Sequence, residues 1–274
     1  MSWKSLDKGD CKLPDGNVLI SFSGGRTSGF MLHQILEANG GLPERAKVVF
    51  ANTGREMPET LDFVQECSSQ WSVPIIWLEY RKAKPKFEVV SHNSASRNGK
   101  PFEEAIAGKT GNAFLPNQAI RYCTQEMKVL TIKRYLVAQG WKRWTNTVGI
   151  RSDEAHRVKA SKDKRWQNWF TLSEKYSKRD VNAFWSSNSF DLRVTKGFGN
   201  CDGCFLKSEA QLAALKRDYP DRFQWWSDME ARCNGQFHKL RSYDGLGSFV
   251  SAQKDWIFDL EGASCQKDDG ECTI

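Results

Sequence analysis

Residues 17–28, NVLISFSGGRTS, decide the fold of this chain of 274 amino acids. The segment 17–22 is short, apolar and rich in β-formers, which predicts a buried strand. From Ser28 to Ala38 apolar residues recur at helical spacing, and Asn39-Gly40-Gly41 predicts the end of that helix. A glycine-rich turn between a first strand and a first helix is where parallel α/β sheets bind phosphate groups.

The loop between that strand and that helix has the composition of a phosphate-binding loop. Gly24 and Gly25 have no Cβ atom, so backbone N–H groups can approach an anion. The rest of the loop adds hydroxyl groups and one guanidinium, from Ser23, Thr27, Ser28 and Arg26. The spacing matches neither G-x-x-x-x-G-K-[ST] nor G-x-G-x-x-G. A plain strand-to-helix turn is the alternative interpretation.

Outward from this loop, short apolar segments alternate with helical segments. We expect further strands at 47–51, 73–79 and 144–150, and further helices after Pro58 and at 124–138. This alternation predicts an α/β fold, with a parallel twisted sheet and helices on its faces. Residues 81–118 are less regular, and we expect an insertion or active-site flap there, with a short helix near 102–107.

The composition changes near residue 158, which suggests two parts. We expect residues 1–158 to form a nucleotide-binding α/β domain. We expect residues 159–274 to form a basic, tryptophan-rich and mostly helical C-terminal subdomain that carries cysteines. In this second part, a capping box at Ser208 and Gln211 predicts the start of one helix, and residues 221–232 predict another.

Charge and composition exclude several classes of protein. Lys plus Arg is 40 and Asp plus Glu is 33, a net charge of +7 that permits an anionic partner such as a nucleotide or nucleic acid. No apolar run approaches the roughly 18 residues of a membrane span, and no secretory leader is evident, so we expect a cytoplasmic protein without a membrane partner. Basic runs beside Trp166, Trp169 and Trp185 suggest a surface for single-stranded nucleic acid, with core packing as the alternative.

Three motifs in this order resemble those of the PP-loop superfamily, the adenine nucleotide alpha hydrolase-like proteins. That group includes ATP pyrophosphatases and the reductases of phosphoadenosine phosphosulfate (PAPS). Residues 23–28 resemble its SGG-x-[DT]-S loop, residues 51–54 follow the second expected strand, and residues 149–157 resemble G-x-R-x-x-E-x-x-R. The likeness covers roughly residues 17–158. It is greatest to PAPS-reductase-like proteins with an SGGRTS loop, often carried by phages and prophages.

The resemblance implies binding of an adenine nucleotide, either ATP or one of the PAPS type. It implies nucleotide contacts from all three motifs: Ser23, Gly24, Gly25, Arg26, Thr27, Ser28, Asn52, Thr53, Gly149, Arg151, Glu154 and Arg157. Arg151 and Arg157 would donate to phosphate or sulfate, and Glu154 would orient an arginine or the ribose. Thr27 stands where many ATP-cleaving members have an Asp that helps to order Mg²⁺. ATP cleavage and binding of another adenylated nucleotide therefore both stay open.

Eight cysteines in a chain without a leader indicate metal binding or reactivity more than disulfides. Cys201 and Cys204 form a C-x-x-C pair, and Cys123 precedes an expected helix, whose N-terminus stabilises a thiolate. The resemblance to sulfur-transferring PP-loop enzymes leads us to expect a [4Fe–4S] cluster on Cys123, Cys201, Cys204 and Cys272. For the fourth ligand, Cys265, Cys233 or no protein ligand are alternatives. Zinc and unmetallated thiols are the alternatives to the cluster.

Cys123 and Cys272 are also candidate catalytic nucleophiles. PAPS reductases use a cysteine in a C-terminal E-C-G-[IL]-H motif, of which Gly270-Glu271-Cys272-Thr273-Ile274 shares only the Glu-Cys pair. The thiol chemistry of those reductases is therefore not carried over to Cys272 on this evidence.

Together these features predict an enzyme of sulfur or redox chemistry, an oxidoreductase or a transferase. Two reactions fit: reduction of a sulfonucleotide, or adenylation of a tRNA or DNA target followed by sulfur transfer. Either reaction needs an electron or sulfur donor protein as a partner. The alternative is a non-enzymatic, zinc-containing nucleic-acid-binding protein with a degenerate nucleotide loop. The sequence leaves the oligomeric state open.

Overall fold

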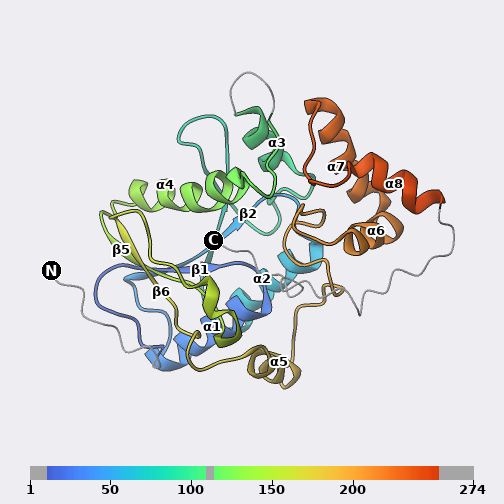
Figure 1. Cartoon of the computed structure of the whole chain (residues 1–274). Helices are drawn as coiled ribbons and strands as arrows, with labels where there is room; N and C mark the ends of the chain where they lie inside the picture. Colours follow the sequence, from blue (N-terminus) through green and yellow to red (C-terminus); the bar gives the residue numbers. More distant parts are fainter. Residues whose placement is uncertain (1–10, 109–113, 253–274) are drawn as a thin grey trace.

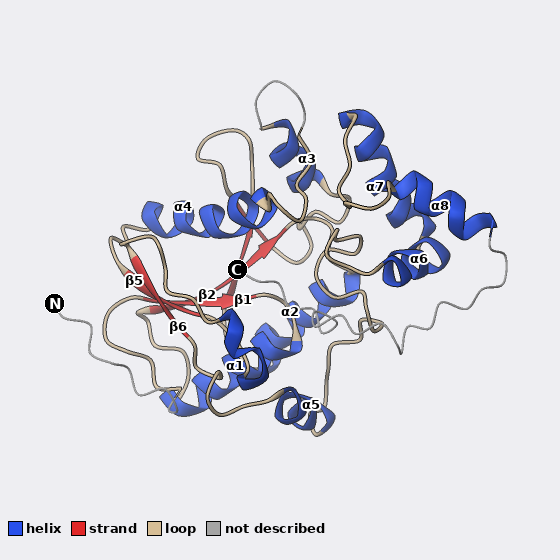
Figure 2. Cartoon of the chain, in the orientation of Figure 1, coloured by secondary structure: helices blue, strands red, loops and turns tan. Residues whose placement is uncertain are grey.

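The computed structural model describes residues 11–108 and 114–252. A six-stranded sheet in the order β4-β3-β2-β1-β5-β6 lies at the centre of the described residues (Figures 1 and 2). The strands are β1 (Val18–Phe22), β2 (Ala46–Asn52), β3 (Ile75–Glu79), β4 (Glu88–Val90), β5 (Trp144–Thr147) and β6 (Trp166–Trp169). Neighbouring strands are parallel except β4, which pairs antiparallel with β3. The predicted α/β fold with a parallel sheet is confirmed.

Helices flank this sheet and form a separate group beside it. The α-helices are α1 (Arg26–Asn39), α2 (Pro58–Gln70), α3 (Lys100–Ala107), α4 (Thr131–Ala138), α5 (Lys178–Ser186), α6 (Glu209–Asp218), α7 (Pro220–Cys233) and α8 (Tyr243–Ala252). Two shorter elements are the π-helix η1 (Thr124–Leu130) and the 3₁₀-helix η2 (Ser152–Arg157). The helix expected at 124–138 therefore begins with a π-helical segment.

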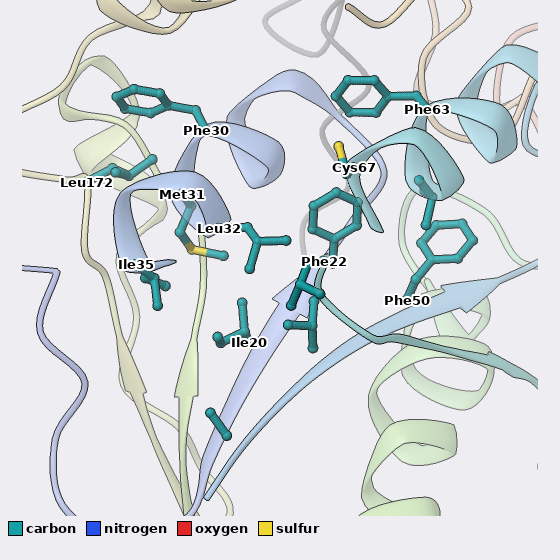
Figure 3. Close-up of a cluster of buried hydrophobic side chains, with 14 of the residues drawn as sticks. Ile20, Phe22, Phe30, Met31, Leu32, Ile35, Phe50, Phe63, Cys67 and Leu172 are labelled. Carbon is teal, nitrogen blue, oxygen red and sulfur yellow. The ribbon is translucent and has the colours of Figure 1, made fainter. Parts of the chain in front are cut away.

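One face of the sheet packs against α1 and α2, and α5 joins the same hydrophobic cluster by packing against α1. Apolar side chains from alternate positions of β1, such as Ile20 and Phe22, meet Met31 and Ile35 of α1 (Figure 3). Phe63 and Cys67 of α2 extend the same cluster, and both are almost completely buried. Because successive residues of a strand point to opposite faces, Leu19 instead packs on the other side with α4. The two helical layers therefore hold β1 in the interior, where its carboxyl end can form a rigid site.

The C-terminal helices form a third cluster with α3. Figure 1 shows α6, α7 and α8 grouped beside the sheet, with α3 next to α7. Phe102 of α3 packs against Trp225 and Trp226 of α7, with ring centroids 5.6 and 5.4 Å apart. Trp225 Nε1 donates a hydrogen bond of 3.0 Å to the Glu103 carboxylate. The segment expected as a flap is thus held, at α3, by packing against the C-terminal helices.

Two features of residues beyond 158 differ from the expectation. The edge strand β6 pairs with β5 and α5 packs against α1, so the α/β layer continues past the expected boundary. β6 was not predicted from the sequence because it is only four residues long and mixes polar with aromatic side chains, a pattern that is not typical of a buried strand. Trp169 and Trp185 are buried in the same hydrophobic cluster as α1, so packing explains these two tryptophans. Among the described residues, no helix has the length and apolar character to cross a membrane.

Candidate functional site

The glycine loop after β1 has the conformation of a loop that opens onto a helix N-terminus. Gly24 has φ of +82°, and a Cβ atom there would lie 2.8 Å from Thr60 Cγ2 of α2, so only glycine fits. Gly25 is extended and precedes the first residue of α1. The first N–H groups of any α-helix have no partner within the helix, which makes this end a place for an anion.

Hydroxyl groups hold the shape of this loop. Ser28 Oγ donates to the Gly25 carbonyl oxygen at 2.8 Å and accepts from the Gly25 N–H at 3.2 Å. The Ser23 hydroxyl donates to Ser28 Oγ at 3.0 Å. Two of the three predicted hydroxyl residues therefore shape the loop itself.

The guanidinium of Arg26 pairs with Asp191. Arg26 Nε donates to Asp191 Oδ1 at 2.8 Å and Nη2 donates to Oδ2 at 2.6 Å, a bidentate pair on partly exposed side chains. Trp185 Nε1 donates to the Arg26 carbonyl oxygen at 2.8 Å. Residues 185–191 thus brace the glycine loop from outside. Contact of Arg26 with a phosphate stays a prediction.

The third motif meets the glycine loop at the point where the strand order reverses. Strands β2 and β3 lie on one side of β1, and β5 and β6 lie on the other. Arg151 Nη1 donates to Thr27 Oγ1 at 3.0 Å, and a Cβ atom on Gly149 would lie 3.4 Å from Thr27. Open α/β sheets bind ligands at this reversal, outside the carboxyl ends of the strands. The two motifs are therefore brought together at the expected edge.

Carboxylates orient the arginines of this motif. Arg151 is buried and hydrogen-bonds to Asp153, which lies 2 residues away. Burial alone would raise the pKa of Asp153, but the hydrogen bonds and charge of Arg151 lower it below its ordinary value. The Glu154 carboxylate contacts both Arg157, by a hydrogen bond, and Arg151, at 3.6 Å. Glu154 therefore orients two arginines, whatever else it contacts.

The side chains of the second motif, at the end of β2, form hydrogen bonds with other residues of the protein. Asn52 Nδ2 donates to Glu79 Oε1 at 2.6 Å and to the Ser96 carbonyl oxygen at 2.9 Å. The N–H and hydroxyl groups of Thr53 both donate to Glu56 Oε2, at 2.9 and 2.7 Å. Nucleotide contacts of Asn52 and Thr53 stay predictions.

The C-x-x-C turn lies directly against this second motif. Thr53 Oγ1 and Cys201 Sγ are 3.3 Å apart, and the Asp202 N–H donates to the Arg55 carbonyl oxygen at 2.8 Å. The buried Asp202 carboxylate accepts from Arg55 Nη2 and Trp226 Nε1, both at 2.7 Å, and from Arg222. This connection between the sheet and the C-terminal helices has no local signal in the sequence, because the partners lie about 150 residues apart.

The described cysteines do not form a three-thiolate metal site. Buried Tyr122 has Cys123 and Cys233 near it, and these thiols, after burial, raise its pKa. Burial first, then Cys204 and Cys201 among other groups, raises the pKa of Tyr243. The described part of the chain holds no group of three or more His, Cys, Asp or Glu side chains arranged for a metal ion. Cys265 and Cys272 lie outside the described residues, so the expected ligand set stays a prediction.

A cavity of about 430 Å³ lies beside the reversal point, between η1, α4 and strands β1, β5 and β6. Its walls are largely apolar, with Leu19, Val129, Ile132, Val148, Ile150 and Phe170. Its polar residues on the strands are Ser21, Asn146 and Asn168. Its basic residues are Arg121, Lys133, Arg157, Lys159 and Lys162. Of the residues predicted to bind a nucleotide, Arg157 lines this cavity, and so does Trp166 from the predicted nucleic-acid surface. Asn146 and Asn168 could not be predicted, since a polar residue inside a short strand carries no signature of a binding site.

One protein-family model matches the part of the chain that carries this site. The family model described as phosphoadenosine phosphosulfate reductase domain matches residues 17–173. That range includes all three motifs and β6.

Two relatives of similar sequence carry no assigned activity in their names. The "Uncharacterized nin region protein ORF290" of Escherichia phage lambda is 28% identical over 205 residues, which are 73% of this chain and 69% of the relative. The "Uncharacterized protein MJ0066" of Methanocaldococcus jannaschii is 25% identical over 230 residues, which are 77% of this chain. The match spans only 41% of that archaeal protein.

Solved structures give distant likenesses. Phosphoadenylyl-sulfate (PAPS) reductase from Candida auris, in a phosphate complex, has 18% identity and a TM-score of 0.43, over 66% of this chain and 75% of that chain. The U34-tRNA thiolase NcsA from Methanococcus maripaludis, with its [4Fe–4S] cluster, has 10% identity and a TM-score of 0.39, over 88% and 82% of the two chains.

Proposed function

Since the chain belongs to the phosphoadenosine phosphosulfate reductase domain family, a branch of the PP-loop superfamily, we propose that it is an adenine-nucleotide-dependent enzyme of sulfur chemistry. The observation that carries the proposal is the contact between Arg151 and Thr27. It joins the glycine loop to the third motif at the reversal point of the sheet, next to a cavity large enough for a nucleoside.

The nucleotide would lie along the carboxyl ends of β1 and β5. Its phosphates would meet the first-turn N–H groups of α1, where the helix dipole favours negative charge. Its base and ribose would enter the cavity, whose apolar walls suit a planar ring. Arg157 and Lys159 at this cavity supply positive charge for phosphate or sulfate oxygens.

Two features connect this site with sulfur chemistry. Cys201 lies 3.3 Å from Thr53 Oγ1, at the carboxyl end of the strand next to β1. Cys204 is on the same turn, where its N–H donates to the Cys201 carbonyl oxygen at 3.2 Å. The Cys201 thiol thus lies against the second predicted motif, and Cys204 follows on the same turn. Sulfonucleotide reduction and adenylation followed by sulfur transfer to tRNA or DNA both use a thiol or sulfide near the bound nucleotide, and both stay in the proposal.

A [4Fe–4S] cluster is part of the proposal as a separate hypothesis. When bound, such a cluster would supply electrons or a sulfur atom; Cys201 and Cys204 are the ligands we propose first. Because the described cysteines alone do not make a ligand set, no step above depends on a cluster. Iron and acid-labile sulfide measured in anaerobically purified protein test this hypothesis. One zinc per chain and no iron would favour the zinc-containing alternative.

Nucleotide binding is tested by thermal shift with ATP, AMP and PAPS on anaerobically purified protein. At least one should raise the melting temperature, because ligands that bind only the folded state stabilise it. Gly25→Leu should remove the shift, since Gly25 has extended backbone angles that any residue can adopt and a bulky side chain would crowd the loop at the start of α1. Gly25→Ala, with a far smaller side chain, is the control for folding.

If none of the three nucleotides shifts the melting temperature, the proposed function is wrong. A shift that persists unchanged in Gly25→Leu would refute the assignment of the loop. A colourless zinc protein that binds nucleic acid but no nucleotide would establish the non-enzymatic alternative.

A further inference from the structure

A chain of hydrogen bonds with a fixed direction runs across the cavity side of three strands. It begins at the Lys159 carbonyl oxygen, continues through Asn168 on β6 and Asn146 on β5, and ends at Ser21 on β1. Asn146 and Asn168 are paired in the register of β5 and β6, so their side chains share one face of the sheet. All three side chains line the cavity.

The carbonyl group of Lys159 fixes the orientation of Asn168. A backbone carbonyl can only accept, so the amide nitrogen of Asn168 must face it, at 3.1 Å. The Asn168 side-chain oxygen therefore faces β5. An amide flip would oppose two oxygen atoms, which makes this orientation independent of how the amide atoms are assigned.

The orientation of Asn168 in turn fixes which atoms donate and accept at Asn146 and Ser21. Asn168 Oδ1 is an acceptor, so Asn146 must present its nitrogen to it, at 2.9 Å. Asn146 Oδ1 then faces Ser21 and accepts the Ser21 hydroxyl proton at 2.6 Å. Ser21 has a single proton, and this bond uses it. Among the residues that the structure describes, nothing donates to Ser21 Oγ, so its lone pairs are left for a ligand.

We propose that the Lys159–Asn168–Asn146–Ser21 relay makes Ser21 an obligate hydrogen-bond acceptor, which selects a base with an exocyclic amino group and rejects a base with a keto oxygen. The inference rests on the proposed function, because it concerns the base of the nucleotide in that cavity. Ser21 is 3% exposed, and a keto oxygen opposite its lone pairs would lose a hydrogen bond with no water to replace it. Asn146 and Asn168 are positioning residues that act through Ser21.

Apolar walls around the relay favour a base over other groups at this position. Leu19 lines the cavity from β1, Val129 and Ile132 line it from η1 and α4, and Val148 and Ile150 follow the carboxyl end of β5. Such walls suit the faces of a purine ring, while polar groups meet only its edge. The positive charges at the cavity belong to other residues and suit phosphates.

The test compares three triphosphates that differ at position 6 of the purine: ATP, purine riboside 5′-triphosphate, which lacks the amino group, and ITP, which has a keto oxygen and, with it, a proton on N1. Dissociation constants are measured by calorimetry on the full chain. The expected preference for ATP over purine riboside triphosphate is about tenfold, and ITP should bind no better than purine riboside triphosphate.

Substitutions of Ser21 test the acceptor itself, and substitutions of Asn168 test the relay that orients it. Ser21→Ala should weaken ATP and leave purine riboside triphosphate unchanged, so their ratio falls to about one. Asn168→Ala frees Asn146 to turn its nitrogen toward Ser21, which releases the Ser21 proton, so the preference for ATP over ITP should narrow. Asn168→Asp keeps an acceptor for Asn146 and should retain the preference. Asn182→Ala, at an exposed position of α5, is the matched control.

The outcomes distinguish this inference from the function on which it rests. If none of the three triphosphates binds, the proposed function and this inference both fall. If ATP and purine riboside triphosphate bind equally to the wild-type chain, or if Asn168→Ala keeps the full preference over ITP, only the relay is refuted.

Discussion

The hydroxyl oxygen of Thr53 lies 3.3 Å from the sulfur of Cys201, although the two residues are 148 positions apart in the chain. Thr53 directly follows β2, and Cys201 begins the C-x-x-C turn. Their contact places the Cys201 thiol against the second of the three predicted motifs. Long-range contacts of this kind bring sequence motifs that are far apart in the chain into one chemical environment.

Cysteine reactivity should follow burial. Cys67 is fully buried, and burial raises its pKa far above the ordinary value, so it should not react with iodoacetamide in the folded chain at pH 8. Cys201 and Cys204 are half-buried and should react, and a bound nucleotide should slow them. Mass spectrometry of labelled peptides measures this. Rapid labelling of Cys67 with Cys201 protected would contradict the assignment of inert and functional cysteines.

Gly24→Ala should destabilise the fold by about 2–4 kcal/mol. The backbone φ of +82° strains any other residue by about 1–2 kcal/mol, and the new methyl group would also press against Thr60 Cγ2. Gly16 is a matched control, because its φ is +84° and nothing lies within 4 Å of its Cβ position. Urea denaturation should show the smaller loss for Gly16→Ala. Equal losses would mean that the contact with α2 is unimportant.

Arg55→Ala should cost about 3–5 kcal/mol, because it leaves the buried Asp202 carboxylate with one cation fewer. The side chains of Arg55 and Asp202 are 4% and 0% exposed. Arg217→Ala breaks the exposed pair with Asp218 and should change stability by less than about 0.5 kcal/mol. Chemical denaturation of both variants measures the contrast. A small effect at Arg55 would show that the connection to the C-terminal helices is not needed for stability.

The ion pair of Asp153 with Arg151 should stabilise the fold at neutral pH and not in acid. The native pKa of Asp153 is lowered, so its contribution is present above the unfolded pKa and is lost as the pH falls through the native pKa. The melting temperature of Asp153→Asn should therefore lie below that of the wild type at pH 7, with a smaller difference near pH 3. A difference independent of pH would assign the effect to packing.

The sequence predicted the sheet's interior well and its edges poorly. β1, β2 and β3 are apolar on both faces because helices cover both, and such runs are visible without a structure. β6 lacks that pattern because Asn168 faces a cavity and Gln167 is only partly buried. The strand β4, with exposed Val89, has no buried face to create a pattern either.

The candidate site, like the sheet, has one part that could be predicted from the sequence and one part that could not. Residues of the glycine loop and of the third motif could be identified because each is a local string after a strand. The partner that holds the glycine loop could not, because Asp191 binds Arg26 across 165 positions. The same is true beside the second motif, where Asp202 binds Arg55 across 147 positions. Such pairings depend on how the chain folds back and leave no local spacing in the sequence.

The pair Arg26–Asp191 and the contact of Cys201 with Thr53 have a practical consequence for dissecting this protein. A fragment cut at residue 158 would keep the glycine loop, but it would lose the strand beside β5 and both external supports of the nucleotide motifs. The shortest piece that retains them must run through Cys201. Residues 11–201 are thus a minimum for any attempt to graft or trim this candidate site, because residues 159–201 support its loops from outside.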